Sequence, residues 1–234
     1  MKNMRKMVNV LLLCSIFVLT GCADESQYAE TVVKGNLDEI YKGEYDEEYL
    51  SLVEKTEKES ERHYQSRMET EADFLAYYWD MYDESVGQDF ESLDKELQEE
   101  LISFCEEIYS MTDYVVEDAV QYADGSYAVK LSIYPLDVIY LATELYHNNG
   151  YEPLNDYWEK YDGVKFDLMP LEERRVAMEE YNEAIMQLLW DQIDEAGYFE
   201  AETYSILMKT NEDGYRTITQ EDWERINKAL VYYP

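Results

Sequence analysis

The chain has 234 residues, of which 53 are acidic and 19 are basic, so its formal net charge is −34 at pH 7. This excess of carboxylates excludes nucleic acid as the main partner, because proteins that bind it must supply cations that displace its counterions. Apolar residues make up 46% of the chain and aromatic residues 15%, which is enough to bury a core and excludes an acidic disordered tail.

The N-terminal segment, residues 1–21, is typical of a secretory signal peptide. Lys2, Arg5 and Lys6 precede the apolar run 8–19. This run of about a dozen residues is shorter than the roughly 20 that a membrane-spanning helix needs, so it predicts a removable leader. Loss of its three basic residues brings the net charge from −34 to −37.

The leader ends in Leu19-Thr20-Gly21-Cys22, which resembles the lipobox of bacterial lipoproteins. In that family the Cys thiol receives lipid and the leader is then cut just before it. The resemblance implies that Cys22 is lipidated, that residues 22–27 form a tether, and that acyl chains hold the protein on the extracytoplasmic face of the cell membrane. The alternative is an ordinary secretory signal that happens to end in Cys.

One thiol is left in the mature chain, because Cys14 lies in the leader and Cys22 carries lipid; no internal disulfide can therefore form. The remaining Cys105 follows Leu97 and Leu101 at steps of four residues, the spacing of one helix face. Reactive thiols need exposure and nearby positive charge. The position of Cys105 instead predicts a buried, small apolar side chain.

Residues 26–111 predict helices in series, with a break at Gly43. Thr70 is followed three residues later by Asp73. A Thr side chain caps backbone N–H groups, and acidic residues favour the first turn of a helix. This pair therefore predicts a helix start at Thr70.

Two segments alternate apolar and polar residues as strands do. The first covers residues 114–133 and turns at 123–126; the second covers residues 204–218 and turns at 212–214. No change in composition separates the two. We therefore expect both hairpins to join in one antiparallel sheet.

Helical patterns fill the rest of the C-terminal half. Pro135 and Pro170 each precede a helix, Gly197 closes the second of these, and Thr219 caps the last one. The expected ranges are 136–148, 154–161, 170–197 and 220–230. The fold class is therefore α+β and predominantly helical, with a small antiparallel sheet of about four strands packed against helices in a single domain, residues 28–234.

Three loose motifs carry a wider resemblance. They are Gly-Asn-Leu-Asp-Glu-Ile-Tyr-Lys-Gly at 35–43, Tyr-Pro at 134–135 and Asp-Gly-Tyr at 213–215. Over most of the mature chain the sequence resembles uncharacterised lipoproteins of Gram-positive bacteria that carry a domain of unknown function, which implies a location and no chemistry. The closing hairpin also resembles the nuclear-transport-factor-like cone fold, in which a curved sheet wraps helices around a pocket; the extra helices between 136 and 197 depart from that pattern.

Motifs for metal binding and catalysis are missing from the sequence. His63 and His147 stand alone, and a calcium loop over the acidic segment 211–214 would place Lys209 and Gln220 where acidic ligands belong. There is no nucleophile elbow and no Gly-rich phosphate loop. With 53 acidic residues, close carboxylate pairs are expected anywhere and carry no information. We therefore expect no metal and no cofactor, and assign no catalytic residue.

Two stretches combine aromatic and acidic residues, at 77–84 and 157–162. On a helix the acids would share a face, and neighbouring rings could stack on a sugar or cradle a cationic group. The favoured alternative is that the rings belong to the core and the acids to a solvated face. The candidate ligand surface is Tyr78, Trp79, Asp80, Asp83, Tyr157 and Trp158.

The sequence favours a binding or interaction module of the cell envelope, anchored to the membrane through lipid on Cys22. The alternative is an extracytoplasmic hydrolase that acts on wall material through acidic residues. The strong negative charge predicts a basic protein or a cationic peptide as partner and no nucleic acid. A competing interpretation is that the charge only keeps the domain soluble and away from anionic headgroups.

Overall fold

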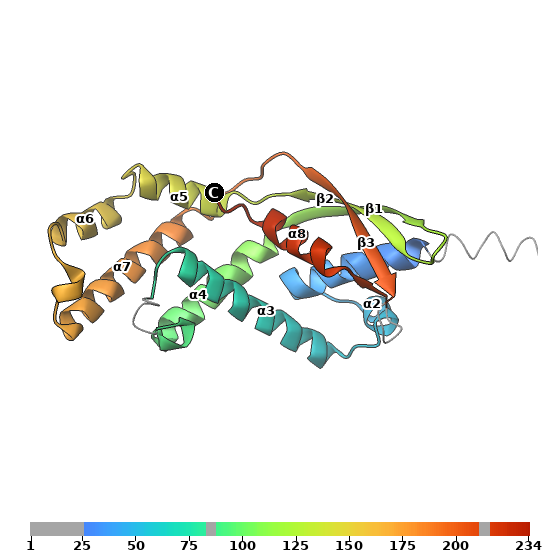
Figure 1. The fold of residues 1–234 in the computed structure, drawn as a ribbon, viewed down its shortest axis with the longest axis horizontal. Helices are drawn as coiled ribbons and strands as arrows, with labels where there is room; N and C mark the ends of the chain where they lie inside the picture. Colours follow the sequence, from blue (N-terminus) through green and yellow to red (C-terminus); the bar gives the residue numbers. More distant parts are fainter. Residues whose placement is uncertain (1–25, 83–87, 211–215) are drawn as a thin grey trace, which may run out of the picture.

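The computed structural model describes residues 26–82, 88–210 and 216–234. The segment predicted as a signal peptide, Cys22, Asp83 and the predicted turn of the second hairpin lie outside the described residues. Within them the structure confirms the expected fold class, a mostly helical α+β fold in which four antiparallel strands pack against helices (Figure 1).

The strands lie in the sheet in the order β1-β2-β3-β4, and all neighbours are antiparallel. The pairing of β2 with β3 joins the two predicted hairpins, with Tyr127 opposite Met208 and Leu131 opposite Tyr204. Alternate residues of β2, from Tyr127 to Ile133, are fully buried. The strands are β1, Asp113–Gln121; β2, Tyr127–Tyr134; β3, Glu202–Thr210; and β4, Arg216–Ile218.

The turn of the first hairpin lies where the sequence predicts it. Gly125 adopts a φ of 84°, a left-handed conformation that glycine reaches without steric cost. The Asp124 carboxylate accepts hydrogen bonds from the backbone N–H and the hydroxyl of Ser126, at 3.0 and 2.6 Å. The tight connection fixes the register of β1 on β2.

The N-terminal half is helical, as predicted. Residues 26–37 form a helix that continues as a π-helical turn, Asp38–Lys42, and ends at Gly43 with a φ of 65°. The following helices are α2, Glu47–Leu52; α3, Glu57–Tyr78; the 3-10 turn η3, Phe90–Ser92; and α4, Lys95–Ser110.

The predicted helix start at Thr70 is wrong, because α3 continues through that residue. The helix begins after Thr56, whose side chain accepts a hydrogen bond from the backbone of Glu59 while the Glu59 carboxylate accepts one from the backbone of Thr56. This reciprocal capping satisfies two backbone donors at once. In mid-helix the Thr70 hydroxyl donates to the Ser66 carbonyl at 2.9 Å, one turn earlier.

Four helices and a short turn complete the C-terminal half. Helices α5 to α7 lie together at one end of the molecule, and the strands lie toward the other (Figure 1). Helix α8 begins at the predicted cap, Thr219, whose side chain accepts from the backbone of Asp222. The elements are α5, Val138–His147; α6, Glu152–Lys160; the 3-10 turn η4, Phe166–Leu168; α7, Leu171–Asp191; and α8, Gln220–Leu230.

Buried apolar side chains from both halves of the chain form a connected core cluster. It joins the helix of residues 26–37, α3, α4, one face of the sheet, α7 and α8. Cys105 is fully buried in this cluster, as its spacing predicts, and burial raises the pKa of its thiol. No helix of the described residues combines the length and apolar character needed to cross a bilayer.

Candidate functional site

A cleft of about 1170 Å³ opens between α7 on one side and, on the other, the end of α3 and the start of α4. It is lined by residues 80–82 after α3, by one side of α7 from Leu171 to Glu183, and by residues just before and in the first turns of α4, namely Leu93, Asp94, Glu96, Leu97 and Glu100. The cleft therefore lies toward the end of the molecule formed by α5, α6 and α7 (Figure 1).

Hydrogen bonds from α7 hold the middle of that helix against the chain that leaves α3. The Tyr181 hydroxyl donates to the Trp79 carbonyl at 2.9 Å, and the Asn182 amide donates to the Met81 carbonyl at 3.1 Å. Asp80, between these two carbonyls, has a φ of 50°. This left-handed residue turns the chain out of the helix.

Contacts with α4 hold the C-terminal part of α7. The Trp190 indole N–H donates to the Glu100 carboxylate at 3.2 Å, and the Trp190 ring meets Phe104 edge to face at 5.2 Å. With its middle and its C-terminal part fixed in this way, α7 forms one wall of the cleft and the start of α4 forms the other.

The apolar part of the cleft surface comes from three elements. Leu97 comes from the start of α4 and Leu93 from just before it, Met178 comes from α7, and Met81 follows α3. Met81 is buried, whereas Leu93, Leu97 and Met178 are half-buried. Leu171, at the N-terminal end of α7, is 81% exposed although it is apolar. These side chains offer apolar surface that a ligand could remove from water.

The polar part of the cleft surface is strongly acidic. Seven carboxylates and two guanidinium groups line it. Arg175 is already paired with Glu172, at 2.8 Å, and with Glu179. Among the described residues, three of the carboxylates have no cationic partner and no hydrogen-bond donor: Asp80, Glu96 and Glu183. Asp94 forms no ion pair within 4 Å, but its charge interacts with that of Arg175.

Two buried polar atoms of residues that line the cleft, Nε of Arg174 and Oδ1 of Asn182, have no hydrogen-bond partner among the described residues. Asn182 is only 6% exposed, and its amide nitrogen is used by the Met81 carbonyl. Its side-chain oxygen, Oδ1, has no hydrogen-bond partner among the described residues. Leaving such an acceptor unsatisfied costs about 1–3 kcal/mol. A ligand that donates a hydrogen bond here would remove that cost.

The structure brings the two aromatic stretches of the candidate ligand surface together behind the cleft wall. Tyr157 and Trp158, on α6, contact the Tyr181 ring at 5.5 and 5.9 Å, and Tyr181 donates to the Trp79 carbonyl. Trp79 and Tyr157 are buried, while Trp158 is 43% exposed. These rings hold α6 and α7 against α3.

The other three residues of the candidate ligand surface are Asp80, Asp83 and Tyr78. Asp80 is exposed and lines the cleft, whereas Asp83 lies outside the described residues. Tyr78 is half-buried and its ring meets Tyr233 at 5.1 Å. Sequence reasoning missed the α4 and α7 residues of the cleft, because nothing in the sequence pairs α4 with α7.

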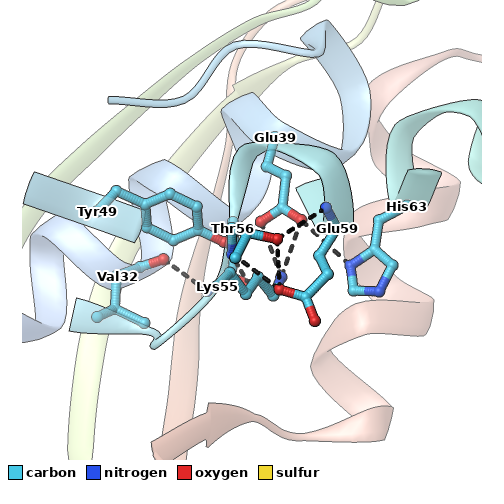
Figure 2. A network of polar contacts seen from close by, with 8 residues as sticks. Val32, Glu39, Tyr49, Lys55, Thr56, Glu59 and His63 are labelled. Carbon is cyan, nitrogen blue, oxygen red and sulfur yellow. Dashed lines mark hydrogen bonds and ion pairs between the residues drawn. The ribbon is translucent and has the colours of Figure 1, made fainter. Parts of the chain in front are cut away.

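A second polar cluster surrounds the fully buried carboxylate of Glu39 (Figure 2). The Lys55 ammonium donates to both of its oxygens, at 2.8 and 2.9 Å. The Tyr49 hydroxyl donates to one of them, and Nδ1 of His63 lies 3.2 Å from the other. The cluster ties the π-helical turn to α2 and α3.

Glu39 is held as an ionised structural anchor. Burial raises the pKa of its carboxyl, but the hydrogen bonds and charge of its partners, Lys55 and Tyr49 foremost, outweigh burial, and the pKa lies below its ordinary value. A general acid needs a raised pKa and a reachable proton. Glu39 therefore gives no support to the predicted alternative of a carboxylate hydrolase. Nowhere in the described ranges do three or more His, Cys, Asp or Glu side chains converge to hold a metal ion.

Comparison with known proteins gives one informative result. No protein family and no curated protein matches the chain. Among solved structures, the fold is similar to the crystal structure of a candidate lipoprotein, YcdA, from Bacillus subtilis, with a TM-score of 0.54 and 14% sequence identity. The match covers 90% of this chain and 58% of that one. At this identity the likeness shows the fold; the resemblance of the closing hairpin to the cone fold stays a prediction.

Proposed function

We propose that the protein is a lipid-anchored binding module on the extracytoplasmic face of the cell membrane, and that the cleft between α4 and α7 binds a positively charged partner. The observation that carries the proposal is the cleft itself. Its 1170 Å³ combine exposed apolar surface, seven carboxylates and a buried amide oxygen without a partner. Pockets that join apolar surface with a few convergent polar groups are the usual form of binding sites.

The location rests on the lipobox and is supported by the fold shared with a bacterial candidate lipoprotein. The helix of residues 26–37 begins at the sheet end of the molecule, opposite α6 and α7 (Figure 1). Only three residues, 23–25, separate Cys22 from its start, and these four peptide steps reach at most about 14 Å. Lipid on Cys22 would thus place the sheet end near the membrane and leave the cleft facing outward.

The partner's charge follows from the cleft and from the whole surface. Anionic headgroups and the acidic domain repel each other within a Debye length of about 8 Å. A basic partner experiences the opposite force, which raises its rate of encounter and selects it over neutral competitors. The carboxylates without a cationic partner, those of Asp80, Glu96 and Glu183, give a basic partner specific contacts.

Neutralising the cleft tests this proposal. In the double variant Glu96→Gln and Glu183→Gln, we expect the affinity of the mature domain for a fluorescein-labelled Lys-rich peptide to fall roughly 2- to 30-fold. This range corresponds to two exposed ion pairs of about 0.2–1 kcal/mol each. The matched control, Glu69→Gln with Glu107→Gln, removes two exposed carboxylates from α3 and α4 outside the cleft. Equal affinities of the two double variants for the peptide, measured by anisotropy, would contradict binding at this cleft. In a separate assay, turnover of purified wall fragments by the mature domain would contradict a pure binding role.

The anchor has its own test. Replacement of Cys22 by Ser removes the thiol that receives lipid, so we expect no incorporation of labelled palmitate and release of the protein, or retention of an uncleaved precursor. The fold should be unchanged, because Cys22 belongs to the expected tether of residues 22–27 and not to the domain. Labelled fatty acid that still enters the Cys22→Ser protein would overturn lipidation at this site.

A further inference from the structure

The shape of the cleft restricts the class of ligand more closely than the charge of the cleft does. On α7 the lining residues lie at positions 171, 172, 174, 175, 178, 179, 182 and 183, which cover one side of the helix along this length. At 1.5 Å per residue this face is about 18 Å long. Residues between 93 and 100 on the facing segment add a second wall. The cleft is therefore an elongated groove between two helical walls.

The apolar residues follow the groove along its length. Leu93 lies just before α4 and Leu97 in its first turn, and Leu171 and Met178 are two turns apart on the same side of α7. The volume of 1170 Å³ exceeds the roughly 300–1,000 Å³ of most small-molecule pockets. Methionine side chains adapt to partners of varied shape, which suits a groove that receives other side chains.

The carboxylates are spread along both walls. Asp94 and Glu96 lie on one wall and Glu183 on the other. Among the described residues no three acidic or metal-ligating side chains converge on a point, so the groove is not arranged around a single small cation. A chain that carries several cations at intervals matches this distribution.

We infer that the ligand is a basic amphipathic α-helix of another protein, which lies along the groove with its apolar side on Leu93, Leu97 and Met178 and its Lys or Arg residues against the acidic walls. A polar side chain of that helix donates a hydrogen bond to Oδ1 of Asn182. Binding of an amphipathic helix in an apolar groove is a recurring mode of peptide recognition. The inference rests on the proposed function and specifies its ligand.

The test compares two synthetic 18-residue peptides of the same Leu and Lys composition. In one the leucines recur every three or four residues, and in the other the order is scrambled. We expect the patterned peptide to bind the mature domain about tenfold more tightly by anisotropy, and to gain helical circular dichroism on binding. Equal affinities would overturn the helix mode and leave the proposal of a basic partner standing. Binding of neither peptide would overturn both.

A pair of substitutions on α7 locates the peptide. Met178→Lys puts a cation on the apolar surface of the groove, and we expect the patterned peptide to lose about tenfold or more in affinity. Val176→Lys is the matched control, because Val176 is 39% exposed on the same helix and does not line the groove. Thermal unfolding of both variants shows whether each one folds. If Met178→Lys folds and binds like Val176→Lys, the peptide does not occupy this groove.

Discussion

At the scale of single residues, a buried charge with its partners makes a large contribution to the free energy of unfolding. Glu39 is fully buried between Lys55, Tyr49 and His63. Removing one partner of a buried pair leaves the other uncompensated, and such changes cost about 3–5 kcal/mol. For Glu39→Gln we expect the lower end, about 3 kcal/mol by urea unfolding at pH 7, because Lys55 keeps some contact with water. Glu48→Gln, an exposed change on α2, should leave the free energy of unfolding nearly unchanged.

The pH dependence of this loss follows from the lowered pKa of Glu39. A carboxyl with a lower pKa in the folded state stabilises the protein fully above its unfolded value, about 4.3, and progressively less as the pH falls through the folded value. The difference between wild type and Glu39→Gln should therefore shrink below about pH 4. A difference that stays constant from pH 7 to pH 3 would contradict an ionised Glu39.

At the scale of elements, caps decide where α3 begins. Thr56→Ala removes a reciprocal cap with Glu59, and we expect a loss of about 1 kcal/mol in the free energy of unfolding. Thr70→Ala changes an exposed mid-helix residue, where Ala has the better helix propensity, so its effect should stay within about 0.5 kcal/mol of zero. Urea titration of the two variants distinguishes them. A larger loss from Thr70→Ala would contradict an uninterrupted α3.

The elements themselves were largely predictable, because their signals are local. Alternation over residues 114–133 and the turn at Gly125 predict the first hairpin, and Thr219 predicts the start of α8; all three are confirmed. Thr70 was misleading because a Thr followed by an acid occurs both at caps and within solvated helix faces. Thr56, with Glu59 three residues later, carried the stronger capping signal.

The groove could not be predicted, because the contacts that form it are distant in sequence. Tyr181 and Asn182 donate to the carbonyls of Trp79 and Met81, about a hundred residues earlier. Asp80 was predicted as a ligand-surface residue for its neighbouring aromatic rings, and it lines the groove because those hydrogen bonds place α7 beside it. Helical periodicity shows that α4 and α7 each have an apolar face, but only the packed structure shows that parts of both remain uncovered.

At the scale of the whole molecule, the net charge acts on folding and on binding in opposite directions. A net charge of −34, or −37 once the predicted leader is removed, destabilises the compact state through self-repulsion, and salt screens that repulsion. The Debye length falls from about 30 Å at 0.01 M to about 8 Å at 0.15 M salt. We therefore expect the midpoint of thermal unfolding of the mature domain to rise over this range of sodium chloride.

The same salt series should weaken the binding of a basic peptide to the groove, because attraction between opposite charges is screened by the same ions. Thermal unfolding and peptide anisotropy measured in one set of buffers then give a rising midpoint and a falling affinity. The neutralised variant, Glu96→Gln with Glu183→Gln, should show a shallower dependence of affinity on salt, since it has two fewer charges in the groove. A rising midpoint with an affinity that does not change with salt would mean that the acidic surface keeps the domain soluble and away from the membrane but does not select its partner.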